Sequence, residues 1–331
     1  MKNILRCISA LIILALLISC CCVSEGNPPR FEFILEDYIM TEPSARVELY
    51  AQLKNRYSVG EDGETFELRD ETGRVLAAQR FTWDRTERAF VINVPSDYTD
   101  KHLLTIYRQG ESEPLSEAIP LFIRTELLPV KSFVPDGNQI AVTVICAAGG
   151  DYSAGIWLDL LDKYGAKATF FCSGMWAEEH PESVRRMYES GHDIGSHAYY
   201  HRHFTQLGYL EIKSDLDRTR DIISEITGGY QTTLFRAPFE EWSYTMNILC
   251  RDLGYDMIHF SVDSHDWESG IEEEAVFSYS TSSRLKSGGI VQFHSSSSAS
   301  LKAADSILDY YVNVLGMELV TVSSFMPVNV N

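Results

Sequence analysis

The sequence predicts an α/β protein with two parts, an all-β domain followed by a deformed (β/α) barrel of about seven units. Seven short runs rich in Val, Ile, Phe, Tyr and Leu recur between residues 31 and 125, as in a β-sandwich. From residue 139 to 331, strand-like runs alternate with helix-like runs. Residues 126–138 contain two prolines and a glycine turn, and we interpret them as a linker.

The N-terminus predicts a targeting segment. Lys2 and Arg6 precede an apolar run too short to span a bilayer comfortably, so residues 1–19 read as a signal peptide. The run ends in "LISC", a pattern typical of lipoproteins in which Cys20 is lipidated, and a polar tether follows at 20–30. An ordinary signal peptide cut nearby is the alternative. We favour a lipoprotein that is anchored to the cell membrane and lies outside the cytoplasm.

Charge and cysteine content exclude some classes of protein. The formal net charge of −19 argues against a nucleic-acid partner, because binding to phosphates requires a basic surface. Cys146, Cys172 and Cys250 fall in the folded region without a C-x-x-C spacing, so no disulfide framework is expected. A bridge between Cys146 and Cys172 is left open, because both follow strands that we expect to be neighbours.

The runs between residues 31 and 125 predict strands with one buried face. Apolar and polar residues alternate in "TFELRD" and "AFVINV", and Thr72-Gly73 supplies a turn. Seven such runs in about ninety residues favour an immunoglobulin-like sandwich. No residue in it suggests chemistry, so we interpret this domain as a spacer or a substrate-presenting module.

The second part predicts parallel strands covered by helices. "IAVTVI" and "AKATFFC" read as buried strands, and Pro181 and Gly191 mark the start and end of a helix between later strands. Another helix ends at Gly228-Gly229. Short connections between strand and helix imply a parallel sheet.

Polar residues follow several of these strands. His197 and His201 lie four residues apart, so if this segment is a helical turn both imidazoles project from one face, a spacing that suits one Zn²⁺ or similar ion. Many histidine pairs with this spacing are merely exposed. Four further positions follow other strands, and parallel α/β folds gather their ligands at the carboxyl ends of strands. These positions are Arg236, Asp263, Asp266 and His294.

Five phrases in order carry a resemblance to a known family: "KYGAKATFFCSG", "GHDIGSHAYYH", "FRAPF", "VDSHDW" and "IVQFH". From Ile140 onward the chain resembles the polysaccharide deacetylase family, also called the NodB-homology or carbohydrate esterase family four domain. The resemblance implies a deformed barrel and metal-dependent removal of acetyl groups from an N-acetylated glycan, such as peptidoglycan or a chitin-like oligomer.

The resemblance also implies roles for individual residues. A divalent metal, in most cases Zn²⁺, would polarise the acetyl carbonyl and acidify a water molecule. His197 and His201 would hold this metal. His294 would act as the general acid, oriented by Asp263, and Arg236 would steady the base. Phe239, through its backbone N–H, and Trp267 would contact the oxyanion or the substrate.

One departure puts the activity in doubt. The family writes its base and its third metal ligand as adjacent aspartates, and aligning the strand "IAVT" puts Ile145 and Cys146 in their places. Ile145 has no proton chemistry. Cys146 is either a thiolate ligand or a small apolar plug, and we favour the plug.

Three carboxylates are candidates for a replacement base. Asp151 follows the flexible stretch "AAGG", and Glu240 and Glu241 follow "RAPF" at the rim. The sequence therefore leaves open an atypical deacetylase that has moved its base and a glycan-binding surface lipoprotein that no longer catalyses.

Overall fold

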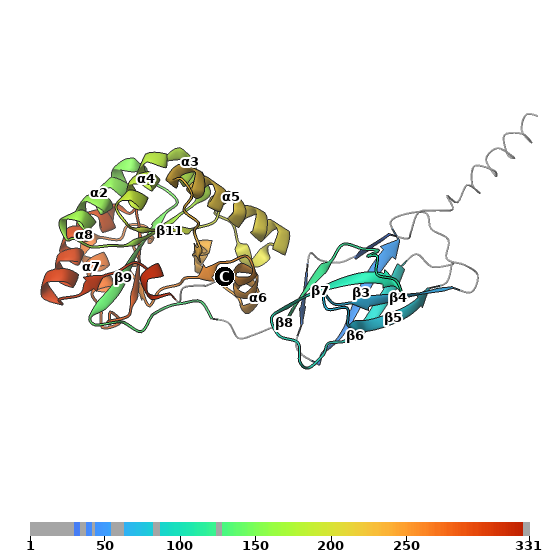
Figure 1. Ribbon diagram of the computed structural model, residues 1–331. Coiled ribbons are helices and arrows are strands. Elements are labelled where there is room, and N and C mark those ends of the chain that lie inside the picture. The colour runs from blue at the N-terminus through green and yellow to red at the C-terminus, as the bar shows by residue number, and fades with distance from the viewer. Residues whose placement is uncertain are drawn as a thin grey trace, which may run out of the picture. The chain divides into compact units, whose positions relative to one another are not determined.

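The computed structural model describes residues 30–33, 38–41, 44–53, 63–81, 87–123 and 128–326. The described residues up to Ile123 form one compact unit and those from Leu128 form a second (Figure 1). The expected signal peptide, Cys20 and the tether as far as residue 29 lie outside the described residues. Within the described part of the chain, no helix is both long and apolar enough to cross a bilayer.

The N-terminal unit consists of two sheets on a shared core. One sheet has the order β1 (Phe31–Phe33), β3 (Arg46–Leu53), β6 (Glu87–Asn93). The other has the order β2 (Ile39–Thr41), β8 (Ile119–Ile123), β7 (Lys101–Arg108), β4 (Glu64–Arg69), β5 (Val75–Phe81). The strands are antiparallel except for the pair β2 and β8.

Alternation explains how these sheets meet. In β4, Phe66 and Leu68 are fully buried, and in β6 Phe90 and Ile92 are fully buried, since every second side chain points to the same face. These residues from both sheets belong to one apolar cluster. The unit is therefore a β-sandwich, while its immunoglobulin-like character stays a prediction.

The C-terminal unit is built on a curled parallel sheet, as the sequence predicts. Its strand order is β13-β12-β11-β10-β9-β15-β14, and β16 also pairs with β9. All of these pairs are parallel. The strands are β9 (Gln139–Cys146), β10 (Thr169–Cys172), β11 (Asp193–Ser196), β12 (Leu234–Phe235), β13 (Asp256–Met257), β14 (Val262–Asp263), β15 (Ile290–His294) and β16 (Glu318–Leu319).

Helices cover the outer face of this sheet (Figure 1). They are α2 (Asp151–Lys163), α3 (Gly174–Glu179), α4 (Pro181–Glu189), α5 (Tyr209–Thr227), α6 (Tyr244–Asp252), α7 (Glu273–Ser280) and α8 (Ser298–Asp309). Two of the expected boundaries are confirmed: Pro181 opens α4, and Gly228 ends α5 in a left-handed conformation with φ of 76°.

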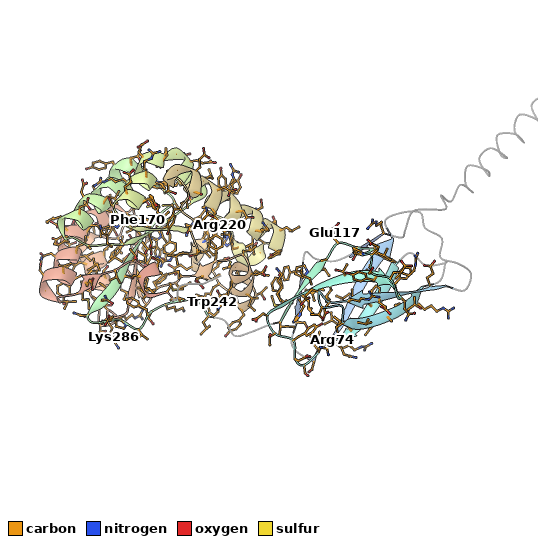
Figure 2. All side chains as sticks on the ribbon, viewed as in Figure 1. Arg74, Glu117, Phe170, Arg220, Trp242 and Lys286 are labelled. Atoms are coloured by element: carbon orange, nitrogen blue, oxygen red, sulfur yellow. The ribbon has the colours of Figure 1, made fainter. Side chains whose placement is uncertain are left out.

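Strand β9 is buried on both faces. Val142, Val144 and Cys146 join the core between the sheet and the helices, which also contains Phe170 (Figure 2). Ile145 belongs to a second apolar cluster, on the inner face of the curled sheet. This division decides which residues of β9 reach the cleft described below.

Residues 130–133 of the expected linker 126–138 are part of the second unit. The backbone N–H of Val130 donates to Met257 O, and the N–H of His259 donates to Val130 O. Phe133 donates its N–H to Gly288 O, and its ring stacks on Phe325 at 3.7 Å between centroids. This segment, residues 130–133, therefore pairs with the residues after β13 and with those before β15.

Candidate functional site

A cleft of about 460 Å³ lies at the carboxyl ends of the parallel strands. Of the residues proposed from sequence, six line it: His197, His201, Phe239, Glu240, Trp267 and His294. Ile145, Ala237 and Gln292 complete the wall. The strands thus bring together residues as far apart in the sequence as Ile145 and His294, as expected when parallel strands end at one edge.

The two histidines after β11 lie close together. The ring centroids of His197 and His201 are 5.4 Å apart. The Nδ1–H of His197 donates to Arg236 O at 2.8 Å, which leaves Nε2 as the free ring nitrogen. Burial lowers the pKa of His197 to about 3, and burial also lowers the pKa of His201. Both rings are therefore neutral near pH 7.

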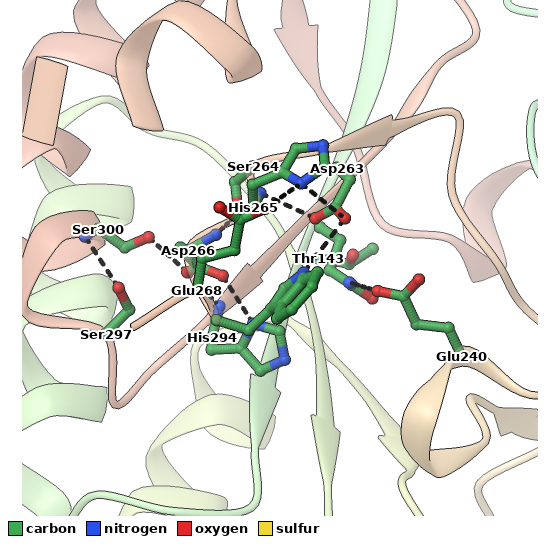
Figure 3. A network of polar contacts seen from close by, with 12 residues as sticks. Thr143, Glu240, Asp263, Ser264, His265, Asp266, Glu268, His294, Ser297 and Ser300 are labelled. Carbon is green, nitrogen blue, oxygen red and sulfur yellow. Dashed lines mark hydrogen bonds and ion pairs between the residues drawn. The ribbon is translucent and has the colours of Figure 1, made fainter. Parts of the chain in front are cut away.

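His294 is held by Asp266, and the prediction that Asp263 orients it is wrong. The Nδ1 of His294 lies 2.7 Å from Asp266 Oδ1, and its backbone N–H donates to Asp266 Oδ2 at 2.7 Å (Figure 3). Ser300 donates its hydroxyl to the same carboxylate. Asp266 is 5% exposed and joins the loop after β14, the end of β15 and helix α8.

Asp263 has a different task. It accepts the backbone N–H of His265 at 2.9 Å and the indole N–H of Trp267 at 3.3 Å. His265 is left-handed, with φ of 55°. This turn rotates the chain between the two aspartates, so that Asp263 steadies the loop and Asp266 faces His294. The role expected for Asp263, orienting His294, thus belongs to Asp266, three positions further along the loop.

Arg236 has no candidate base as a hydrogen-bond partner, although the resemblance implies one. It is 1% exposed, and its guanidinium donates to Thr143 Oγ1 at 2.7 Å, to Ile258 O at 3.2 Å and to His259 O at 2.9 Å. Burial lowers the pKa of Arg236 to about 9, opposed by the charges of Glu240 and Asp263. The side chain therefore braces the inner face of the sheet as a cation.

The end of β9 is apolar at the cleft. Ile145 is 5% exposed and lines the cleft, while Cys146 is fully buried in the core with the opposite side-chain direction. Cys146 and Cys172 are register partners, and both are free thiols. A hydrogen bond with Cys146, together with burial, raises the pKa of Cys172. Cys146 as a metal ligand is thus contradicted, and the alternative, an apolar plug, agrees with its surroundings.

Of the three candidate replacement bases, the structure places only Glu240 in the cleft. Its Oε1 accepts the amide N–H of Gln292 at 2.8 Å. Burial raises the pKa of Glu240; the charge of Asp263 adds to this, and the Gln292 hydrogen bond opposes it. Phe239 and Glu240 both have φ of 58°, a left-handed conformation that costs roughly 1 kcal/mol or more per residue. The backbone is therefore strained where it presents this carboxylate.

The other two carboxylates are engaged elsewhere. Glu241 accepts from His203 at 2.6 Å and from the Thr205 hydroxyl at 2.8 Å. Asp151 does not lie in a flexible stretch, because it is the first residue of α2 and accepts from Ser183 at 2.6 Å. A carboxylate in the first turn of a helix is favoured by the helix dipole, so Asp151 stabilises α2. It is not among the residues that line the cleft.

Gln292 is a cleft residue that the sequence interpretation missed. It is fully buried, and its Oε1 has no hydrogen-bond partner among the described residues. Alternation along "IVQFH" offered a signal, because Gln292 lies two positions before His294 and so shares its face. Thr143, which accepts a hydrogen bond from Arg236, was also missed, although it lies two positions before Ile145 on β9 and so shares its face.

The cleft does not fit a catalytic metal centre. The family implies a divalent cation, and catalytic zinc sites use three protein ligands with one open position. Here two neutral imidazoles converge, but the third position is Ile145, and Cys146 faces the core. Among the described residues, no group of three His, Cys, Asp or Glu side chains is placed to hold a metal ion.

Comparison with known proteins agrees with the fold of the C-terminal unit. The family model described as polysaccharide deacetylase matches residues 151–258. The C-terminal unit therefore contains a region similar to the polysaccharide deacetylase family.

Particular relatives make the similarity concrete. A chitin deacetylase of Arthroderma benhamiae is 30% identical over 174 residues, which are 49% of this chain and 47% of the relative. The solved structure of peptidoglycan deacetylase PdaC from Bacillus subtilis is 29% identical, with a TM-score of 0.53 over 58% of this chain and 91% of that chain. A family 4 pseudoenzyme from Bacillus anthracis shares the fold at 18% identity, with a TM-score of 0.55 over 68% of this chain and 83% of that chain. This chain spans about half the length of the chitin deacetylase.

Proposed function

We propose that the C-terminal unit is a non-catalytic glycan-binding domain with a deacetylase fold, carried by a surface lipoprotein. The position of Ile145 carries this proposal. A deacetylase of this family needs a base and an anionic metal ligand at the end of β9. Ile145 supplies neither at the cleft wall, and the Cys146 thiol lies in the core. Loss of a general base alone commonly costs about 10²–10⁴-fold in rate.

Aromatic side chains support glycan as the ligand. Trp267 is 57% exposed and Phe239 is 50% exposed, and both line the cleft. Large exposed rings at a cleft mark a binding surface, and their flat faces suit the C–H face of a sugar ring. Relatives are named for deacetylation of chitin and of peptidoglycan. A cell-wall or chitin-like polymer of N-acetylated sugars is therefore the ligand class that we propose.

Glu240 favours a second candidate function, an atypical deacetylase. Its carboxylate lies in the cleft, and burial raises its pKa toward the range in which a general base works near neutral pH. The cleft nonetheless offers only two metal ligands, which leaves the acetyl oxyanion without the cation that the family uses. We therefore place this function second.

An acetate-release assay distinguishes the two. The full mature chain, purified in detergent, is incubated with peptidoglycan and with chitin in the presence of Zn²⁺ or Co²⁺. We expect the wild type to sediment with the polymer and release no acetate, and the Ile145→Asp variant, whose new carboxylate faces the cleft, to gain release. Release by the wild type that Glu240→Gln abolishes and Glu241→Gln leaves intact would establish the atypical deacetylase instead.

We also propose that Cys20 anchors the protein to the cell membrane from the outside. The basic start, the apolar run and "LISC" support this. Cells fed a clickable fatty acid should label the wild type and a Cys21→Ser control but not Cys20→Ser. Equal labelling of Cys20→Ser would contradict the anchor. The β-sandwich would then hold the cleft unit away from the membrane as a spacer or present glycan to it.

A further inference from the structure

The cleft presents an unusual pair of hydrogen-bond acceptors. Glu240 projects its carboxylate into the cleft from the strained 239–240 turn, and the Nε2–H of His259 donates to Glu240 O at 3.0 Å, which fixes the backbone there. The amide of Gln292 holds Oε1 of this carboxylate at 2.8 Å. No hydrogen bond from another described residue reaches Oε2, so one face of the carboxylate is available to a ligand.

The second acceptor is Gln292 itself. Its side chain is fully buried and lines the cleft, and its Oε1 has no partner among the described residues. A buried acceptor without a donor is costly, and native structures contain few such groups. A donor on a bound ligand would complete it. Glu240 and Gln292 together therefore call for a ligand group that carries several N–H donors.

The charges around this pair favour a cation. Glu240 and Asp263 are both close enough to influence Arg236, but the three hydrogen bonds of Arg236 go to uncharged oxygens. Arg236 is thus committed to the sheet, and the Glu240 carboxylate has no ion-pair partner among the described residues. A ligand ammonium group would form a charge-assisted hydrogen bond with Glu240, and such bonds are about twice as strong as neutral ones.

An acetamido group fits this wall poorly. It carries one N–H donor and adds a carbonyl oxygen, which would face the acceptors of Glu240 and Gln292. A site built to bond a donor rejects an analogue that lacks it, because the buried polar groups are then left unpaired. A free amine supplies up to three donors and a positive charge at the same position.

Resting on the glycan-binding function proposed above, we propose that Glu240 and Gln292 bind the protonated 2-amino group of a de-N-acetylated hexosamine unit within the polymer. The cleft then recognises the product of deacetylation. The polymer as a whole still belongs to the N-acetylated class, and the site selects the units that have lost their acetyl group.

The test compares two tetramers that differ only in acetylation. Calorimetric titration of the full chain in detergent uses the tetramer of glucosamine and the tetramer of N-acetylglucosamine, at a pH where the amines are protonated. We expect the glucosamine tetramer to bind about tenfold more tightly or better, the gain of one charge-assisted hydrogen bond. Nα-acetyl-lysine amide serves as a non-sugar amine and should bind far more weakly.

Variants assign the preference to the two residues. Glu240→Gln removes the charge and keeps the shape, so the preference should fall to about twofold or less. Glu241→Gln is the matched control, because its carboxylate bonds His203 and Thr205, and it should keep the wild-type preference. Gln292→Met should weaken the preference by a smaller factor. Glu240→Asp retains the charge and should retain part of the preference, and circular dichroism verifies that each variant is folded.

The possible failures are distinguishable. Equal or tighter binding of the acetylated tetramer would overturn the amino-sugar inference and leave the glycan-binding function standing. Equal loss in Glu240→Gln and Glu241→Gln, or binding of the lysine derivative as tight as that of the sugar, would overturn it as well. A folded protein that binds neither tetramer nor insoluble peptidoglycan or chitin would refute the glycan-binding function itself.

Discussion

Two neighbouring strands end at the cleft in opposite ways. Ile145 on β9 and His294 on β15 are register partners. At the end of β9 the cleft wall is apolar, and Cys146 turns into the core. At the end of β15, His294 is bonded by Asp266, which also binds Ser300. The cleft wall is therefore apolar at the end of β9 and carries a bonded histidine at the end of β15.

The difference teaches that a retained motif is weak evidence for catalysis. Asp266 accepts a side-chain and a backbone hydrogen bond from His294 and one hydrogen bond from Ser300, so it joins three elements of the fold. Arg236 likewise bonds Thr143 and two backbone carbonyls. Hydrogen bonds of this kind stabilise the fold whether or not the site catalyses, so the retention of these residues does not decide activity.

The largest expected effect is on stability, at Asp266, which bonds His294 at the end of β15. Asp266→Ala leaves the buried hydroxyl of Ser300 and the partly exposed His294 without their shared acceptor, so the free energy of unfolding should fall by about 3 kcal/mol. Chemical denaturation followed by tryptophan fluorescence measures it. Asp263→Ala, which loses two loop hydrogen bonds, is the matched control and should cost clearly less. If the two variants are equally destabilised, Asp266 has no special structural role.

Arg236 tests the same idea beside β9. Arg236→Lys should cost about 2 kcal/mol, because a lysine ammonium cannot reproduce the planar fork that reaches Thr143 and two carbonyls. The measurement is again the free energy of unfolding. The exposed Arg186→Lys, on helix α4, is the control and should change it little. A tolerated Arg236→Lys would mean that the guanidinium does not brace the sheet.

Acid tests the histidines whose pKa is lowered by burial. His192 bonds the backbone N–H of Ala168, and burial lowers its pKa to about 4. The unfolded chain binds a proton below its ordinary pKa of about 6.5, and the folded chain does not until about 4. Stability is therefore complete above pH 6.5 and is lost as the pH falls toward 4, by about 2 kcal/mol for this group at pH 5.

His192→Gln removes that linkage. Between pH 7 and pH 5, the free energy of unfolding of this variant should fall by about 2 kcal/mol less than that of the wild type. Burial also lowers the pKa of His259 to about 4, so this residue should act in the same way. The free energy of unfolding of the His192→Gln/His259→Gln double variant should therefore depend still less on pH. An unchanged pH dependence in His192→Gln would contradict the neutral buried ring.

The smallest expected effect concerns the rim of the cleft. Trp267→Ala removes an exposed ring, so stability should change by less than about 0.5 kcal/mol. Affinity for the glucosamine tetramer should fall about tenfold if the ring stacks on sugar. Titration calorimetry and thermal unfolding, run together, separate the two quantities. Tyr188→Ala, an exposed ring on α4, should leave the affinity unchanged.

The sequence predicted the fold through periodicity and the site through topology. Parallel strands end at one edge, so His197, His201 and His294 could be brought together on paper, and their meeting in the cleft is confirmed. Loop geometry was beyond that reasoning. The left-handed His265 decides between Asp263 and Asp266, and the first turn of α2 removes Asp151 from the cleft. The direction of the side chains at the end of β9 places Cys146 in the core, where it cannot serve as a ligand in the cleft.

The segment 130–133 has a mechanical consequence. Val130 is bonded to Met257 and His259, and Phe133 to Gly288. A pull that enters the C-terminal unit along the chain from Leu128 meets these bonds before it reaches Gln139, where β9 begins. The hydrogen bonds of segment 130–133 therefore bear a force on the chain before β9 does. Tension on the chain would be carried by β13 and the start of β15, and the wall of the cleft at Ile145 would keep its shape under load.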